Sequence, residues 1–432
     1  MPAEWEPHEA TWLGWPHELT DWPGKFSPIP WAFAEIVRHL TRVERVHLIV
    51  EDRTAEVRAR AMLEKAGAIV EAVTFFHIPT DRGWMRDSGP IGVAATPSGA
   101  CHSERGVPDA PSVFAGAANT PVREVDESLF SDAHRQPSMS EERYFDSGSR
   151  PQAPREKGLR EPSLRMTQAV DAEPQADRDS ARDDNEAADV ELLNFVFNGW
   201  AKYDDYKKDA RVVVLANRRL RRNLILPEHK KRRVVLEGGA IDVNGCGTLL
   251  TTEECLLSDS GIQVRNPGFT KYDYAQVFKK YLGVTNVLWL RRGIAGDDTH
   301  GHIDDLARFV DAKTVVTVVE EDRAEANYEP LQENLAVLRE MKDQDGQPLR
   351  VATLPMPGPV YFAGQRLPAS YAIFYIANGM VLVPTFNDPA DRVALNTLAS
   401  LFPDRAIVPI YCRDLVLGLG TIHCMTQQLP RI

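Results

Sequence analysis

Long hydrophobic runs, paired cysteines and a basic N-terminus are all missing from this sequence. No stretch of about 18 apolar residues occurs, so no membrane span is expected. Residues 1–8, MPAEWEPH, have neither a basic start nor an apolar stretch, so no signal peptide is expected. The five cysteines are odd in number and show no CxxC spacing, which argues against a disulfide framework and for a reducing, cytoplasmic compartment.

Positive charge is also in deficit. The formal net charge is −12 at pH 7, which disfavours nucleic acid and suits cationic partners. Residues 97–189 carry 19 Asp and Glu against 11 Lys and Arg, with nine of the 30 prolines and no tryptophan. Such a composition cannot bury enough apolar surface to offset chain entropy. We therefore expect one domain over residues 1–432 with a long disordered insertion at 97–189, either inert or regulatory and partner-binding.

The rest of the chain alternates strand and helix signals, as is typical of an α/β protein. Strands are expected at 46–50, 211–215, 233–236, 314–319 and 380–384, and helices at 31–40, 55–66, 274–281, 329–341 and 391–401. Five strand–helix groups suggest a repeated α/β unit. The segments 90–95 and 190–197 flank the insertion and are expected to pair as a hairpin, whose tip tolerates insertions.

Cys424 is the best candidate for a nucleophile. It lies in GLGTIHCMTQQ (418–428), where glycine lets the backbone approach a ligand closely. The neighbouring His423, or a helix end, favours the thiolate form. A buried structural cysteine is the alternative. We expect replacement of Cys424 to abolish catalysis and replacement of Cys255 to spare it.

Acidic and imidazole side chains gather in three further segments. His302 and Asp304 are two residues apart, so on an extended segment they would face the same side. Glu237 follows an expected strand and precedes two glycines, and Asp87 precedes Ser-Gly-Pro. Solvated turn acids are the alternative for both. Trp84 lies close to Asp87 and could form the wall of a cation site.

A metal site is a second interpretation of the segment around His302. THGHIDD (299–305) is similar to the ligand run of the metallo-β-lactamase hydrolases, but Asp305 stands where the last histidine should be. A dinuclear site also needs further histidines downstream, and only His423 follows. In the segment LEGGAIDVNGCGT (236–248), which contains Glu237, Asp242 and Asn244 look like ordinary hairpin residues.

A thiol, a histidine and three carboxylates are together suited to guanidinium chemistry. Carboxylates form bidentate pairs with a planar guanidinium. A thiolate that adds to the guanidinium carbon, with a histidine as proton carrier, would release ammonia without a metal or cofactor.

The motifs then make the resemblance specific. The sequence resembles the agmatine deiminase family, which includes bacterial peptidylarginine-deiminase-like proteins, within the guanidine-modifying superfamily. The matching stretches run from end to end and skip only the insertion: residues 2–8, 84–90, 236–239, 248–255, 298–305, 369–371, 375–379 and 422–428.

The resemblance implies a single-domain, five-bladed, pseudo-symmetric α/β propeller (the pentein fold) with a central polar pocket. It implies that Cys424 is the nucleophile, that His302 is the general acid and base, and that Asp304 is a third catalytic acid. Glu237 and Asp87 would hold the guanidinium. The implied reaction converts agmatine and water into N-carbamoylputrescine and ammonia through an amidino-thioether, as in polyamine biosynthesis.

The resemblance also implies a small cationic guanidino substrate, no metal, no cofactor, and no nucleic acid or membrane partner. A homodimer is compatible with it. The chain departs from the family at Leu419 and Thr421, in a loop that usually reads Gly-Gly-Gly-Asn, and at His300, which is commonly Asp and would read the far end of the substrate. Free or peptide-terminal arginine, a metal-dependent hydrolase and a non-catalytic binding protein stay open as alternatives.

Overall fold

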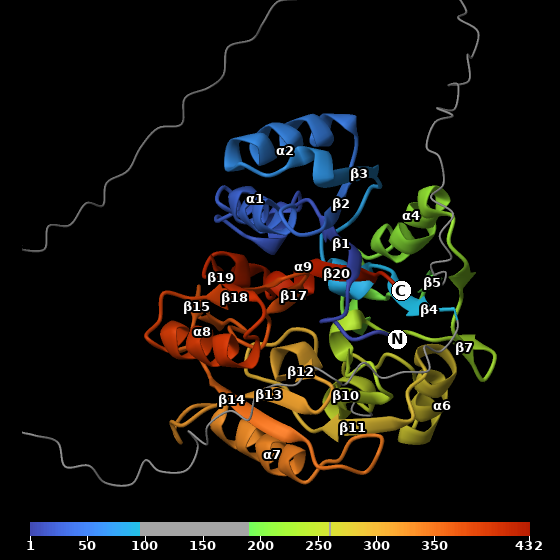
Figure 1. The fold of residues 1–432 in the computed structure, drawn as a ribbon, viewed down its shortest axis with the longest axis vertical. Coiled ribbons are helices and arrows are strands. Elements are labelled where there is room, and N and C mark those ends of the chain that lie inside the picture. Colours follow the sequence, from blue (N-terminus) through green and yellow to red (C-terminus); the bar gives the residue numbers. More distant parts are fainter. Residues whose placement is uncertain (96–189, 259–260) are drawn as a thin grey trace, which may run out of the picture. The chain divides into compact units, whose positions relative to one another are not determined.

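The computed structural model describes residues 1–95, 190–258 and 261–432 (Figure 1). The chain divides into two units, Met1–Glu104 with Glu186–Ile432, and Arg105–Asn185. The second unit, and the expected insertion at 97–189, lie outside the described residues, so the disorder assigned to the insertion stays a prediction. The described helices and strands all belong to the first unit.

Within the described residues, five sheets share one motif: a strand that runs antiparallel to a pair of parallel strands. The largest sheet has the order β20-β1-β2-β3 and contains β20 (Thr426–Pro430), β1 (His8–Gly14), β2 (Arg45–Val50) and β3 (Val73–His77). The second contains β4 (Ile91–Ala94), β5 (Val190–Leu193) and β6 (Leu224–Ile225), and the third β9 (Asp242–Val243), β10 (Thr248–Thr252) and β11 (Asn286–Leu290). The fourth contains β12 (Ala307–Asp311), β13 (Thr314–Val319) and β14 (Arg350–Pro355), and the fifth β17 (Tyr375–Ala377), β18 (Met380–Thr385) and β19 (Ala406–Tyr411).

A helix connects the parallel strands of each sheet and lies beside them in Figure 1. These helices are α1 (Ile29–Leu40), α2 (Arg53–Ala66), α4 (Val212–Leu220), α6 (Lys271–Leu282), α7 (Tyr328–Arg339) and α8 (Ala390–Leu401). Shorter α-helices are α3 (Met85–Ser88), α5 (Glu253–Leu256) and α9 (Ile422–Met425). Single 3₁₀ turns occur at η1 (Leu19–Asp21), η2 (Val70–Ala72), η4 (Gly199–Ala201), η5 (Asp209–Arg211), η6 (Gly238–Ala240), η7 (Ile303–Asp305) and η8 (Leu415–Gly418). Two small hairpins complete the fold: β7 (Glu228–His229) with β8 (Arg232–Arg233), and β15 (Tyr361–Phe362) with β16 (Gln365–Arg366).

Local sequence explains where the helices begin and end. Thr270 and Asp273 form a capping box at the start of α6, and Gly283 ends that helix at a φ of 71°. The side chain of Asp52 caps α2, which ends at Gly67 with a φ of 76°. Glycine occupies both end positions because it adopts a positive φ without steric cost.

The two ends of the chain meet in one sheet. β1 pairs in parallel with β2 and antiparallel with β20, so Trp12 lies opposite Gln427. The hydrophobic cores on both sides of this sheet contain residues from the first and the last segments of the chain. The strand that follows Cys424 is therefore held in place by the N-terminal segment.

Most of the expected elements are present. All five expected helices are confirmed, as are the strands at 46–50, 314–319 and 380–384, and β4 pairs antiparallel with β5 as the flanking hairpin requires. The expected strand at 211–215 is wrong, because α4 occupies it. Its valines resemble a strand, but Val212, Val213 and Ala216 are buried together, which is helical spacing. The expected strand at 233–236 is only β8 and an isolated bridge at Val235.

Two further expectations concern the state of the cysteines and the presence of a membrane span. Among the described cysteines, Cys255, Cys412 and Cys424 are free thiols. In the described ranges no helix combines the length and the apolar character that crossing a membrane would need. The cytoplasmic location and the homodimer stay predictions.

Candidate active site

Four short helical turns carry the five residues that the sequence singled out. Asp87 lies on α3, Glu237 caps η6, His302 and Asp304 lie at η7, and Cys424 lies on α9. Each turn leads into the antiparallel strand of a different sheet, β4, β9, β12 or β20. The turn α3 contacts α9 and η6, and η6 contacts η7. The repeated motif therefore brings together residues that are up to 337 positions apart in the chain.

The five side chains gather around His302. Its Nδ1 atom lies 3.9 Å from Oδ1 of Asp87 and 3.8 Å from Oδ1 of Asp304. The thiol of Cys424 lies 3.9 Å from Oδ2 of Asp304. Four of the five are buried, whereas Cys424 is partly accessible. A ligand would therefore reach the cluster over the thiol. The segment at His302 is a 3₁₀ turn and not the extended segment that we expected.

Two glycines allow this close approach. A Cβ atom on Gly239 would lie 2.5 Å from Nδ1 of His302 and 2.9 Å from Oδ1 of Asp87. A Cβ atom on Gly420 would lie 3.1 Å from Sγ of Cys424. The two distances at Gly239 leave no room for a side chain unless its neighbours shift, and a side chain at Gly420 would crowd the thiol. Glycine therefore serves here for space and not for backbone conformation.

Each guanidinium-binding candidate has a fixed partner. Asp87 accepts hydrogen bonds from Nε1 of Trp200 at 2.9 Å and from the backbone N–H of Gly239 at 3.0 Å. Glu237 accepts one from Nε of Arg265 at 3.0 Å, and both side chains are fully buried. Neither Trp200 nor Arg265 could be selected from the sequence, because each is distant from its partner along the chain.

A buried charge network lies beneath the cluster. His423 contacts Asp304 through Nδ1 at 2.6 Å and Glu4 through Nε2 at 2.9 Å. Glu4 also pairs with Arg86 at 2.9 Å and with Arg308 at 2.8 Å. Arg308 in turn pairs with Asp242. Asp242 lies on β9, which pairs antiparallel with β10 as expected for a hairpin residue, and it also belongs to this buried network. A cavity of about 20 Å³ is lined by Glu4, Arg86 and His423.

The electrostatics set the protonation of the nucleophile and the histidine. Burial, and then the carboxylates of Asp304, Asp305 and Asp87, raise the pKa of the Cys424 thiol well above its ordinary value. Burial lowers the pKa of His302, but Asp87, the Cys255 thiol and Asp304 outweigh it and hold that pKa well above its usual range. In the substrate-free site the thiol is therefore neutral and the imidazole is protonated.

Asp87 and Asp304 differ in the direction in which their pKa is shifted. Burial raises the pKa of Asp87, and the nearby His302 offsets only part of this effect. Burial also acts to raise the pKa of Asp304, but the hydrogen bond from His423 and the nearby positive charges lower it overall. Asp304 is thus held as a carboxylate, whereas Asp87 is protonated more readily than an exposed aspartate.

Cys255 lies beside the cluster of five residues, although from the sequence we expect its replacement to spare catalysis. It lies on α5 and is buried, and its thiol, an oxygen of Glu237 and a ring nitrogen of His302 lie within 4.8 Å of one another. In the sequence, Cys255 is marked by its place at the end of the family stretch 248–255. Because it contacts His302, Cys255 cannot serve as a neutral comparison for Cys424.

The remaining two substrate-binding candidates lie in different surroundings. Trp84 is buried, and its Cζ3 atom is 3.0 Å from the position of a Cβ on Gly420, next to the Cys424 thiol. His300 has a φ of 68° and pairs with Glu254 at 3.5 Å. It lines a surface pocket of about 600 Å³ together with Arg291 and other residues. The substrate-binding role of both stays a prediction.

The metal interpretation of THGHIDD does not fit the geometry. In the described part of the chain, the group of His, Cys, Asp or Glu that could hold a metal ion combines His302 with Glu237 and Cys255. His300 and Asp305, from the same motif, are not in this group.

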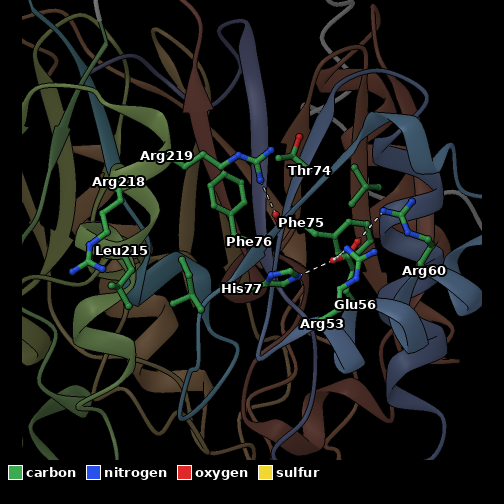
Figure 2. A pocket seen from close by; sticks show the side chains of 12 residues that line it. Arg53, Glu56, Arg60, Thr74, Phe75, Phe76, His77, Leu215, Arg218 and Arg219 are labelled. Atoms are coloured by element: carbon green, nitrogen blue, oxygen red, sulfur yellow. Dashed lines mark hydrogen bonds and ion pairs between the residues drawn. The ribbon is translucent and has the colours of Figure 1, made fainter. Parts of the chain in front are cut away.

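A second surface cavity of about 610 Å³ lies away from these residues (Figure 2). It opens between α2, β3 and α4, where Arg53, Arg60 and His77 all pair with Glu56. It contains none of the residues that the sequence singled out, so we do not place the chemistry there.

Comparisons with known proteins identify the family of the chain. The chain matches the family of Porphyromonas-type peptidyl-arginine deiminases over residues 1–107 and 175–430. It is 29% identical over 456 residues to an agmatine deiminase of Pseudomonas aeruginosa, covering 100% of this chain and 95% of that protein. The crystal structure of a putative arginine deiminase from Porphyromonas gingivalis is 31% identical, with a TM-score of 0.69 and coverage of 100% and 97%. An agmatine deiminase structure from Enterococcus faecalis, 24% identical, shares the fold with a TM-score of 0.72 and coverage of 100% and 95%.

Proposed function

Because the chain belongs to the Porphyromonas-type peptidyl-arginine deiminase family, we propose that it is a guanidine deiminase that converts agmatine and water into N-carbamoylputrescine and ammonia. The name of the Pseudomonas aeruginosa relative, which aligns with the whole chain, supports agmatine as the substrate. The five sheets with one motif support the finer proposal that the fold is a five-bladed α/β propeller.

The observation that carries the proposal is a pair of buried carboxylate oxygens without hydrogen-bond partners. Oε2 of Glu237 and Oδ1 of Asp304 are both buried and unpaired, and both carboxylates belong to the cluster that contains the thiol. Buried polar atoms in native proteins are nearly always paired, so these two oxygens point to a missing donor. A planar guanidinium supplies several N–H donors and a positive charge.

The arginines near the site favour a substrate without a carboxylate. The buried arginines of the described ranges are Arg86, Arg265 and Arg308. Arg86 and Arg308 pair with Glu4, and Arg265 pairs with Glu237. Each is already engaged by an internal carboxylate, and none is left to bind the α-carboxylate of free arginine. Agmatine lacks that group and carries only the primary amine at its far end.

The first chemical step requires the substrate itself. The thiol of Cys424 is neutral in the free enzyme, since burial and the nearby acids raise its pKa. A bound guanidinium adds positive charge beside the thiol and favours its ionised form. The proton leaves through Asp304, which lies 3.9 Å away. The thiolate then forms a bond to the guanidinium carbon, and a C–N π pair moves onto nitrogen.

His302 carries the protons of the later steps. As an imidazolium it donates a proton to the departing nitrogen, the C–N bond breaks, and ammonia leaves behind an amidino-thioether on Cys424. The now neutral His302 accepts a proton from water as the water oxygen bonds to the same carbon. As the C–S bond breaks, the proton of the new hydroxyl passes to solvent, where ammonia takes it up, and the urea product is released. The proton on Asp304 then returns to the thiolate and restores the neutral thiol of the free enzyme. The raised pKa of His302 suits its first role as an acid.

Ammonia release from agmatine, free arginine and arginyl peptides tests this function. We expect agmatine to give the highest kcat/KM and Cys424→Ser to abolish turnover of every substrate. Cys412→Ser is the matched control, because Cys412 is also a free thiol and packs in the hydrophobic core. Preference for arginine would overturn the substrate assignment. Activity in Cys424→Ser would overturn the mechanism.

A further inference from the structure

Three buried donor groups meet on one side of the candidate site. An oxygen of Glu237, the sulfur of Cys255 and a ring nitrogen of His302 lie within 4.8 Å of one another. The three residues are at most 2% exposed. The proposed deimination uses Glu237 and His302 with Cys424, and leaves the Cys255 thiol without a role.

Two of these donors have no hydrogen-bond partner. Oε2 of Glu237 and Nε2 of His302 are buried and unpaired, because Arg265 engages only Oε1 of Glu237. A buried carboxylate oxygen and a buried imidazole nitrogen without partners are rare in native proteins. The carboxylate oxygen has a free lone pair, and the imidazole nitrogen offers one once the ring has lost its proton. The Cys255 thiol lies within 4.8 Å of both groups.

We infer that Glu237, Cys255 and His302 form an inhibitory site for a thiophilic divalent cation of the zinc class. One sulfur, one nitrogen and one oxygen are the donors that Zn²⁺ prefers, and three protein ligands leave a fourth tetrahedral position open. Calcium and magnesium are disfavoured because they need six or more oxygen ligands. Binding converts the Cys255 thiol into a metal-bound thiolate and displaces the proton from the His302 nitrogen that binds the ion, so two protons are released.

The charge of the site would attract such an ion. The carboxylates of Asp87, Asp304 and Glu237 stand around His302. Arg265 pairs with Glu237 and His423 with Asp304, and once His302 has lost its proton Asp87 has no cationic partner among the described ion pairs. The same negative charge would attract a guanidinium, so ion and substrate should compete. This step rests on the proposed function: an ion on His302 occupies the nitrogen that would carry protons, and turnover stops.

The sulfur ligand distinguishes this site from a metal bound to the nucleophile. Cys424 is directed to Asp304 and does not belong to the three-donor group. We therefore expect the thiolate of Cys255, and not that of Cys424, to bind the ion.

Cobalt(II) is a suitable probe, since thiolate-to-cobalt charge transfer gives near-ultraviolet absorption without any turnover. The full chain, freed of metal and kept reduced, is titrated with Co²⁺ alone, and Zn²⁺ affinity is measured by calorimetry. We expect one ion per chain and a charge-transfer band in the wild type, in Cys424→Ser and in the control Cys412→Ser. In Cys255→Ser the band should disappear and the Zn²⁺ affinity should fall by at least about tenfold.

A second variant protects the test against misfolding. Glu237→Gln keeps the shape of the side chain, should keep the charge-transfer band, and should bind Zn²⁺ about tenfold more weakly. No band in the wild type, or a band lost in Cys424→Ser but kept in Cys255→Ser, would overturn the inference. Because these readouts do not involve ammonia release, they separate failure of the metal site from failure of the deiminase assignment.

Discussion

His423 positions the acid that faces the nucleophile: its Nδ1 atom lies 2.6 Å from Oδ2 of Asp304. The same carboxylate oxygen is 3.9 Å from the thiol of Cys424, the next residue in the chain. The other ring nitrogen of His423 reaches Glu4, which belongs to the N-terminal segment. The charge state of Asp304 therefore depends on a contact that fixes the two ends of the chain together.

Replacing His423 with alanine should weaken both stability and catalysis. The change leaves the carboxylates of Asp304 and Glu4 without a shared partner, and breaking a buried charged contact costs about 3 kcal/mol or more. The pKa of Asp304 should rise, because the hydrogen bond from His423 lowers it. We expect KM for agmatine to increase and kcat to fall about 100-fold, with partial recovery when imidazole is added.

His47→Ala is the matched control for that variant. His47 is a buried histidine that packs on Trp12 and Phe76, and burial lowers its pKa to about 4. Its removal should lower the melting temperature but leave kcat and KM unchanged. If His423→Ala retained wild-type kcat and KM, the positioning role would be excluded.

The indole of Trp200 should control the acid side of the pH profile. Burial raises the pKa of Asp87, and the hydrogen bond from Trp200 opposes this. Asp87 must be ionised to hold a cation, so activity should fall as the pH drops through its raised pKa. Trp200→Phe removes the donor, and kcat/KM should begin to fall at a pH about one unit higher. The basic limb, which reflects loss of the His302 proton, should stay in place.

Trp31→Phe provides the comparison, since Trp31 is exposed on α1. Its pH profile should coincide with that of the wild type. An acid limb that did not move in Trp200→Phe would show that Asp87 is not the group that titrates there.

The pair formed by Arg265 and Glu237 allows structure and chemistry to be separated. Arg265→Met leaves the Glu237 carboxylate buried and unpaired, and should destabilise the protein by about 3–5 kcal/mol. Adding Glu237→Gln to Arg265→Met removes the unpaired buried charge and should recover part of the lost stability. Activity should not recover, because the substrate loses a carboxylate. Thermal unfolding and ammonia release of the two single variants and the double variant measure both effects.

The sequence was enough to identify the reactive residues of the site, but not the residues that hold them in position. Asp87, Glu237, His302, Asp304 and Cys424 could be selected because thiol, imidazole and carboxylate groups stand out beside glycines and in matching family stretches. The structure brings these five residues together, and it does so through a repeated strand–helix motif whose hydrophobic pattern is visible in the chain.

The supporting residues could not be found in the same way. The contacts between Trp200 and Asp87, between Arg265 and Glu237, and between His423 and Glu4 join residues 113, 28 and 419 positions apart. No local pattern encodes such pairs, because the fold alone decides which side chains meet. The error at α4 has a similar origin: a run of valines fits either a strand or a buried helix, and packing decides between them.

Gly239 gives the most direct test of how tightly the site is assembled. Its backbone N–H binds Asp87, and a methyl group at its Cα would overlap Nδ1 of His302 at 2.5 Å and crowd Oδ2 of Asp304 at 3.1 Å. Gly239→Ala adds no strain from a positive φ, so its stability cost should be about 1–3 kcal/mol from crowding alone. A shift of about 1 Å in the reacting groups costs on the order of 100-fold in rate, so kcat should fall at least that far.

Gly358→Ala is the control: Gly358 is exposed and faces only the Asp388 carboxylate, which can move. Wild-type kcat in Gly239→Ala would mean that displacing His302 and Asp87 leaves the rate unchanged, and would exclude them from one tightly assembled catalytic site.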